Sequence, residues 1–144
     1  MIEQDTIRLL RECDAGIKMG VSSIDEVQDY IRDEQLRQCL TEYKEKHEIL
    51  RRDIQSLLDK YHDEGKEPNP MAKSMSWMKT NMKLVMHESD ATIADLMTDG
   101  CNMGVKSLNK YLNQYKAADE QSKDIAKRLI NIEENLAIDI RKFL

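Results

Sequence analysis

Turn-forming and aromatic residues are scarce in this chain. Its 144 residues include five glycines and two prolines, and aromatic side chains make up 5%. An all-β sandwich needs many turns and is disfavoured, and collagen-like, low-complexity and disulfide-scaffold classes are excluded. Cysteine is sparse too: Cys13, Cys39 and Cys101 form no Cys-x-x-Cys motif and cannot all pair. We expect three reduced thiols in or near helix packing, and hence a cytoplasmic protein.

The chain also lacks an apolar run of the roughly 18 residues that cross a bilayer. Its first residues, MIEQDTIRLL, lack the basic and apolar regions of a signal peptide. The net charge of −5 and the pI near 5.3 argue against a surface that binds phosphate groups. We therefore expect neither a membrane nor a nucleic acid as a partner. The 40% of hydrophobic residues suffices for one packed domain, residues 1–144.

Helical periodicity dominates the N-terminal part of the chain. Apolar residues from Ile2 to Ile31 line one helix, and Asp33 is placed to cap the start of the next. Short links force helices to pack antiparallel, so residues 2–62 are predicted to form a helical hairpin. The stripe of the second helix alternates steps of four and three residues: Leu36, Leu40, Tyr43, His47, Leu50, Ile54, Leu57 and Tyr61.

A break follows the second helix. Gly65 is a candidate C-cap or turn residue, and two prolines shortly after it cannot continue a helix. Residues 63–88 are predicted to be a link and a crossover helix that runs from about residue 71 to 86. Ser89 and Asp90 supply the cap for a further helix, and Asp119 caps the last, which we expect to reach Leu144. Residues 89–144 thus form a second predicted hairpin.

The two hairpins resemble each other in sequence. Met19-Gly20-Val21 recurs as Met103-Gly104-Val105, displaced by 84 residues, and Asp33-Glu34-Gln35 recurs as Asp119-Glu120-Gln121, displaced by 86. A two-residue insertion in the second hairpin loop explains the change of offset. We predict two hairpins of common design, related by a pseudo-twofold axis. The repeat also favours one long first helix over a new start at Ser23, because the corresponding Ser107 lacks a capping box.

Two ionisable residues fall inside the predicted core stripes. His47 lies in the second helix, and Glu133 occupies the equivalent position of the last helix. A buried carboxylate is costly unless it is paired, so the two are predicted to face each other across the bundle centre. The alternatives are a metal or ligand site, or a shifted register that places both at the surface. Glu48 and Glu134, which adjoin them, are either boundary residues on a solvated face or further carboxylates of such a site.

Four glycines form two Gly-x-x-x-Gly pairs in the middle of predicted helices, at Gly16/Gly20 and Gly100/Gly104. Each glycine costs roughly 1 kcal/mol relative to alanine in a helix interior, so something offsets that cost. We expect close backbone approach of the first and third helices of the bundle. The alternative is a pocket kept open for a ligand.

The predicted crossover helix carries a stripe of methionines. Methionine adapts its shape, and such stripes serve as docking surfaces as well as core. Either the stripe packs inward over the bundle, or it forms a dimer or partner interface with Trp77 as an anchor on its flank. The interface candidates are Met71, Met75, Trp77, Met78 and Met82.

This layout resembles the ferritin-like superfamily, and more narrowly the small bacterial rubrerythrin-related bundles of unknown function. The resemblance covers the whole chain and rests on the repeat and on residues 9–24 and 76–112. It implies an all-α, up-down four-helix bundle of two repeated hairpins joined by a crossover helix. Metal-bearing members carry a Glu on two helices and Glu-x-x-His on the other two. Here Lys44 stands three residues before His47, Ile130 stands three before Glu133, and the glycine pairs replace the other carboxylates.

A di-iron site needs about four carboxylates around two cations, and this pattern lacks them. We therefore expect no metal, no cofactor and no catalytic residue, and a protein that acts by assembly or partner binding, as a homodimer. The alternative is an iron or manganese protein with oxidase or peroxidase activity. Its ligands would be His47, Glu133, Glu48 and Glu134.

Overall fold

Four long helices make up most of the described chain. The computed structural model describes residues 2–68 and 89–144. Helix α1 spans Ile2–Val27, the short 3-10 helix η1 spans Gln28–Tyr30, and α2 spans Glu34–Lys60. Helix α4 spans Asp90–Gln114, α5 spans Glu120–Asp139, and a second 3-10 helix, η2, spans Arg141–Phe143. The described ranges contain no strand, so the all-α prediction is confirmed.

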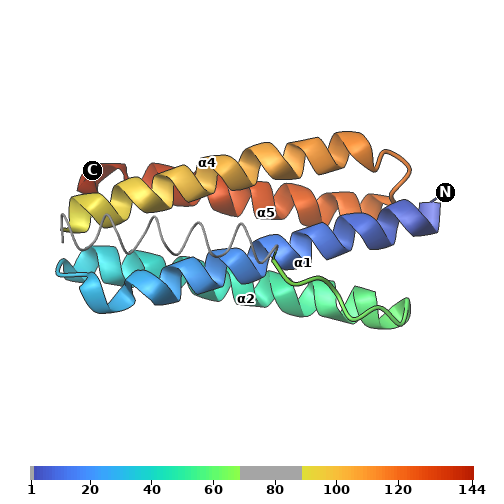
Figure 1. The fold of residues 1–144 in the computed structure, drawn as a ribbon, viewed down its shortest axis with the longest axis horizontal. Helices are drawn as coiled ribbons and strands as arrows, with labels where there is room; N and C mark the ends of the chain where they lie inside the picture. Colours follow the sequence, from blue (N-terminus) through green and yellow to red (C-terminus); the bar gives the residue numbers. More distant parts are fainter. Residues whose placement is uncertain (1, 69–88) are drawn as a thin grey trace.

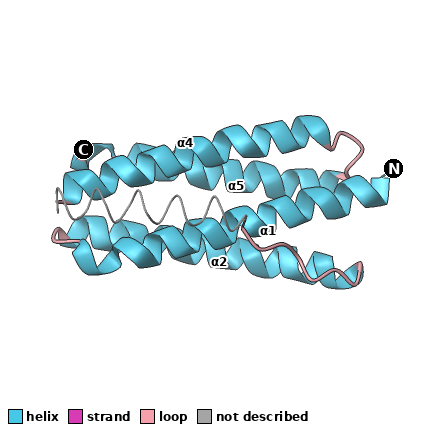
Figure 2. Ribbon diagram, viewed as in Figure 1, coloured by secondary structure: helices cyan, strands magenta, loops and turns pink. Residues whose placement is uncertain are grey.

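The helices pack as two antiparallel hairpins that lie side by side (Figure 1). Helix α1 pairs with α2 and α4 with α5, and α1 also contacts both helices of the second hairpin. Helices α2 and α4 run in the same direction, so the chain between them connects opposite ends of the bundle. Figure 2 shows the described loops at the two ends and along the segment after α2. None of the described helices combines the length and apolarity needed to span a membrane.

Three of the helices begin at side-chain caps that the sequence predicts. The Asp33 carboxylate accepts from the backbone N–H groups of Gln35 and Leu36 at the start of α2. The Ser89 hydroxyl caps α4, and the Asp119 carboxylate caps α5. Each cap satisfies N–H groups that have no partner inside the helix. Helix α1 is continuous through both of its glycines, as predicted.

Helices α2 and α5 end before the last residue of their apolar stripes. Helix α5 ends at Asp139 instead of reaching Leu144, because the last residues form tighter 3-10 hydrogen bonds, such as Leu144 N–H to the Arg141 carbonyl. Helix α2 ends at Lys60, and Gly65 adopts a φ of +85°, which glycine tolerates better than other residues. The C-cap of α2 is Tyr61, so the prediction of Gly65 as the C-cap is wrong.

The hydrophobic core divides into two clusters. One gathers around Leu9, Ile17 and Ile54, and the other around Ile24, Leu40 and Ile140. The stripes of α2 and α5 run through both clusters, and each stripe is interrupted at one polar residue between them. That level of the bundle holds the candidate site.

Reciprocal hydrogen bonds join the two hairpins at both ends. The carboxylate of Asp90, in the first turn of α4, accepts from the backbone N–H groups of Arg32 and Asp33, each at 2.9 Å. At the other end, the Thr6 hydroxyl in α1 accepts from the backbone N–H of Asp119, also at 2.9 Å. Each hairpin thus accepts hydrogen bonds from the loop between the two helices of the other hairpin, at the residue that caps its second helix.

Candidate functional site

His47 of α2 and Glu133 of α5 meet in the interior of the bundle. The His47 Nε2 atom lies 2.6 Å from Glu133 Oε1, and the two side chains are 1% and 12% exposed. The other ring nitrogen, Nδ1, lies 2.6 Å from the carbonyl oxygen of Tyr43, one helical turn earlier. The two residues are 86 positions apart in the chain. The prediction that they face each other is confirmed.

The hydrogen bonds decide where one proton of the His47 ring lies. A carbonyl oxygen can only accept, so Nδ1 donates to Tyr43. Burial alone lowers the pKa of His47, because a charged ring is poorly solvated in the interior. The hydrogen bond and the charge of Glu133, together with the Tyr43 carbonyl, outweigh burial and raise this pKa above its ordinary value. The arrangement favours a protonated ring facing a carboxylate.

Two of the four helical glycines lie against this pair. A Cβ carbon on Gly20 would lie 2.9 Å from His47 Nε2, and one on Gly104 would lie 3.6 Å from Glu133 Oε2. A Cβ on Gly16 would have only a side-chain atom within 4 Å, and one on Gly100 would have no described atom within that distance. The expectation that these glycines let the backbones of α1 and α4 approach closely is therefore wrong. Gly20 makes room for the buried His47 ring instead, whereas a Cβ on Gly104 would be in ordinary contact with Glu133. The two polar side chains fill the space that a ligand pocket would need.

Cys101 of α4 adds a third polar group at this level. Its thiol is 2% exposed and hydrogen-bonds to Glu133. Burial first, then the charge of Glu133 and this hydrogen bond, raise the pKa of the Cys101 thiol. The thiol is therefore held protonated and unreactive. The sequence pattern did not reveal this contact, because the residue that corresponds to Cys101 in the predicted repeat is the ordinary core residue Ile17. The position of Cys101 beside a glycine pair was the one available signal.

The two neighbouring glutamates do not join the pair. Glu48 is half-buried and Glu134 is exposed, which fits the interpretation as boundary residues. Within residues 2–68 and 89–144, no three or more His, Cys, Asp or Glu side chains are grouped so that they could hold a metal ion. A surface hollow of about 480 Å³ lies elsewhere, at one end of the bundle between α2 and the C-terminal segment. It is lined by Gln35, Cys39, Ile138, Asp139, Arg141 and Lys142.

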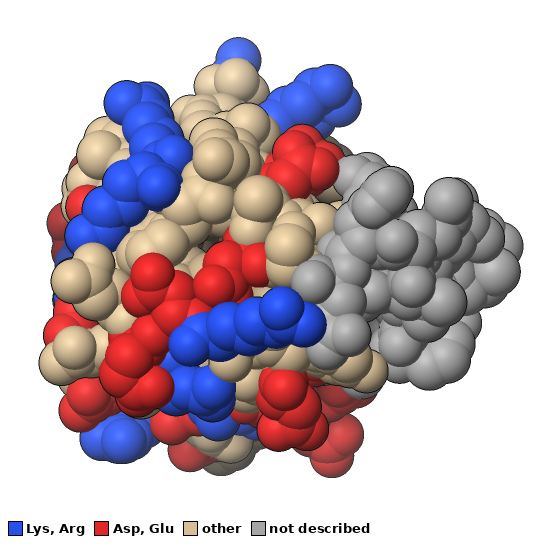
Figure 3. Space-filling model, turned by 90° about the vertical axis from the view of Figure 1, so that its left-hand side faces the viewer, with Lys and Arg blue, Asp and Glu red and all other residues tan. Residues whose placement is uncertain are grey.

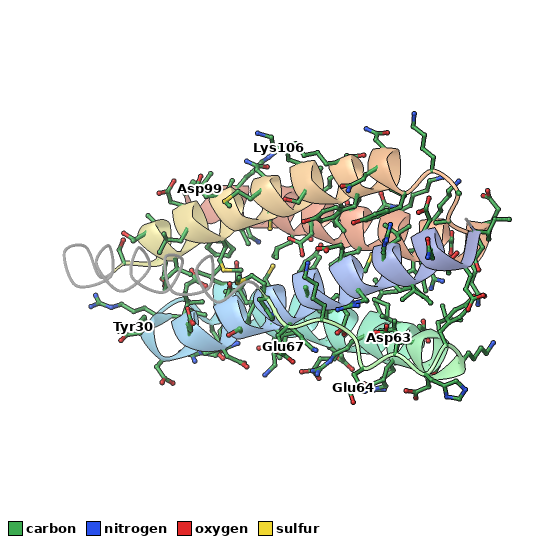
Figure 4. The ribbon with its side chains drawn as sticks, turned by 45° about the vertical axis from the view of Figure 1, so that its right-hand side comes forward. Tyr30, Asp63, Glu64, Glu67, Asp99 and Lys106 are labelled. Carbon is green, nitrogen blue, oxygen red and sulfur yellow. The ribbon has the colours of Figure 1, made fainter. Side chains whose placement is uncertain are left out.

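A second buried charge lies on α1, and the sequence pattern did not predict it. Asp14 is 5% exposed, and its carboxylate pairs with Lys18 Nζ at 2.9 Å and accepts from the Lys66 backbone N–H at 3.1 Å. Lys18 also reaches Glu67, so the segment after α2 is fastened to α1 by ion pairs. Figure 4 shows the side chains of Asp63, Glu64 and Glu67 along this segment. The network anchors the chain where it leaves the first hairpin.

The remaining predicted residues lie outside this site. Met71, Met75, Trp77, Met78 and Met82 fall outside the described residues. On the end of the bundle where η1, the start of α4 and the C-terminus meet, Lys and Arg side chains are interspersed with acidic and uncharged ones (Figure 3). Comparison of the chain with protein-family models, curated proteins and solved structures finds no significant match. The resemblance to ferritin-like bundles therefore stays a prediction.

Proposed function

We propose that this protein is a non-catalytic helical bundle that acts by assembling with itself or with a protein partner. The observation that carries the proposal is the composition of the bundle centre. At this level α2 and α5 contribute His47 and Glu133, which bind each other, and α1 and α4 contribute Gly20 and Gly104. Both ring nitrogens are engaged, so the residues that could bind a ligand are used in holding the helices together.

The same observation argues against a di-iron centre. The ferritin-like resemblance implies carboxylates from all four helices, converging on two cations. Here one carboxylate meets one imidazole and one protonated thiol, and glycines stand on the other helices. This donor set does not fit two iron or manganese ions, because too little negative charge faces them. We propose that the protein uses no metal cofactor.

Elemental analysis tests that part of the proposal. Protein purified without chelators is measured for iron and manganese, beside a His47→Ala variant and an Asn135→Ala control at an exposed position of α5. We expect substoichiometric metal in all three. Stoichiometric metal in the wild type that is lost in His47→Ala alone would overturn the proposal in favour of an oxidase or peroxidase-type protein.

We also propose that the two hairpins are repeats related by a pseudo-twofold axis, as in a ferritin-like bundle. The reciprocal contacts at the two ends support this. Thr6 and Asp90 are 84 residues apart, and the residues they bind, Asp119 and Asp33, are 86 apart, the two offsets of the sequence repeat. Equivalent positions therefore make equivalent contacts.

The proposed interface is the methionine stripe of residues 71–82, and the proposed assembly is a homodimer in the cytoplasm. The three free cysteines support that location, and the net charge of −5 with interspersed signs disfavours nucleic acid. A lysine placed in an apolar interface would have to lose its water when the two surfaces meet, and this costs more free energy than the contact returns. The double change Met75→Lys and Met78→Lys should abolish association while leaving the helical circular dichroism intact.

A matched control uses a methionine that is already in solvent. Met103 on α4 is 68% exposed, so Met103→Lys should leave both helicity and solution mass unchanged. Mass is measured by light scattering across a concentration series. An unchanged mass for the double variant, or dissociation of the Met103 variant as well, would show that the interface lies elsewhere.

A further inference from the structure

We infer that the contact between His47 and Glu133 is a proton-dependent latch, which holds the two hairpins together only while one shared proton lies between Nε2 and Oε1. The inference is independent of the proposed assembly function. It rests on the partners of the two ring nitrogens, on the burial of the pair and on the surroundings of the ring.

The first step concerns how many protons the His47 ring and the Glu133 carboxyl group carry between them. Nδ1 keeps a proton because it donates to the Tyr43 carbonyl. The 2.6 Å contact at Nε2 can then be made in two ways: Nε2–H donates to a carboxylate, or a protonated Glu133 donates to a bare Nε2. Both require one proton between the two atoms. Without it, a nitrogen lone pair would face a carboxylate, and the contact would become repulsive.

The second step concerns what else could supply or replace that proton. From α1 the ring is approached by Gly20, which has no side chain, and from α4 the pair is approached by Gly104 and the Cys101 thiol. The thiol is itself protonated, so it adds no charge. Lys44, on the same helix as His47, is turned to Asp25, with 2.6 Å between Nζ and Oδ1. Of the described residues, Glu133 is the one whose charge acts on the ring.

The third step concerns position. The pair joins α2 of the first hairpin to α5 of the second, between the two apolar clusters of the core. Water has little access to the contact, because the His47 side chain is 1% exposed and the Glu133 side chain is 12% exposed. Loss of the proton is therefore not relieved by solvation unless the helices separate. Opening of the bundle at its middle is thus coupled to release of one proton.

The sign follows from the direction of the pKa shift. The pKa of His47 is raised in the folded protein. The contribution of the latch is therefore complete below the ordinary pKa of histidine, roughly 6.5, and is lost as the pH rises through the raised value. Between the two values the opening equilibrium should rise by up to about tenfold per pH unit, the limit for release of one proton.

The test uses the full chain and the thiol beside the latch. Modification of Cys101 by a neutral alkylating reagent is followed site by site with mass spectrometry, and each rate is divided by that of the denatured chain at the same pH. This ratio removes the intrinsic pH dependence of the thiol. In the wild type it should increase with pH over the interval given above.

Two variants keep the contact but remove its need for the proton. In Glu133→Gln the amide N–H donates to a bare Nε2, and in His47→Gln the new amide donates to the carboxylate. For either variant that folds, the ratio should be flat over the same interval. The control is His62→Asn, at an exposed histidine with a φ of +55° that asparagine tolerates; it should keep the wild-type profile.

Nitrogen NMR of the ring supplies a second, direct measurement. In the wild type at neutral pH both ring nitrogens should have the shifts of protonated nitrogen, and in Glu133→Gln the proton should remain on Nδ1 alone. A wild-type thiol exposure that does not change with pH over this interval, or a variant that keeps the wild-type pH dependence of thiol exposure, would overturn the latch.

Discussion

Gly20 lies so close to His47 that a single added carbon would collide with the ring: its Cβ would lie 2.9 Å from Nε2 and 3.1 Å from Cδ2. Gly104, which corresponds to it in the predicted repeat, leaves ordinary contact distances to Glu133, beginning at 3.6 Å. The two glycines that precede them, Gly16 and Gly100, are less constrained still. The four positions look alike in the sequence, yet the structure distinguishes them by what each faces.

Gly20→Ala should destabilise the protein. The new methyl group must displace a fully buried ring that is tied at both nitrogens, and overpacking of this kind costs about 1–3 kcal/mol. The gain in helix propensity, about 1 kcal/mol, offsets part of that cost. Urea unfolding followed by circular dichroism should show a lower midpoint than the wild type. A raised midpoint would mean that the ring moves aside without cost, which would also contradict its two hydrogen bonds.

Gly100→Ala should have the opposite effect. No described atom lies within 4 Å of the added carbon, and the residue is exposed in the middle of α4. Alanine therefore brings its higher helix propensity, about 0.5–1 kcal/mol, without a steric cost. The same urea titration should show a raised midpoint with an unchanged slope. A fall in stability would reveal a contact at this position.

The reciprocal end contacts should contribute comparable free energies. Thr6→Val keeps the shape of a buried side chain but leaves the Asp119 N–H without its acceptor, which costs about 1–3 kcal/mol. Asp90→Ala removes the acceptor of two backbone N–H groups in a more exposed setting and should cost about 1–2 kcal/mol.

A double-mutant cycle tests the independence of these ends. Thr6 and Asp90 serve opposite ends of the bundle, so their effects on the free energy of unfolding should add. An exposed control, Asn135→Ala on α5, should change little. A strong interaction energy in the cycle would show that the two ends do not act as separate contacts.

The three cysteines should react in a definite order. Cys39 is half-buried, whereas Cys13 and Cys101 are enclosed in the core. Burial, with the charges of Glu12 and Asp14, raises the pKa of the Cys13 thiol to about 12. Because the thiolate is the reactive form, an alkylating reagent at pH 8 should modify Cys39 first. The other two should react only as fast as the bundle opens, and mass spectrometry of the digested protein reads each site. If Cys13 reacted before Cys39, the part of α1 around Cys13 would have to be accessible to solvent, and its burial in the core would be contradicted.

Much of the arrangement followed from local patterns. The caps Asp33, Ser89 and Asp119 were predictable because a short polar side chain before an apolar stripe satisfies the free N–H groups of a helix start. The pairing of His47 with Glu133 followed from the 86-residue offset, since both interrupt a core stripe at the same level. Cys101 was missed because its thiol bonds to a carboxylate from another helix, and the burial of Asp14 was missed because the segment after α2 supplies the Lys66 N–H that it accepts.

The sequence by itself determined the helices, their caps, their apolar faces and the level at which a buried base and acid must meet. These properties depend on residues within a few turns of each other, and periodicity records them. Only the tertiary structure decided which glycine faces the imidazole, which carboxylate needs the chain after α2 to satisfy it, and which hydroxyl holds the opposite loop. Those outcomes depend on how four helices rotate against one another, and a rotation too small to disturb any stripe changes which atoms touch.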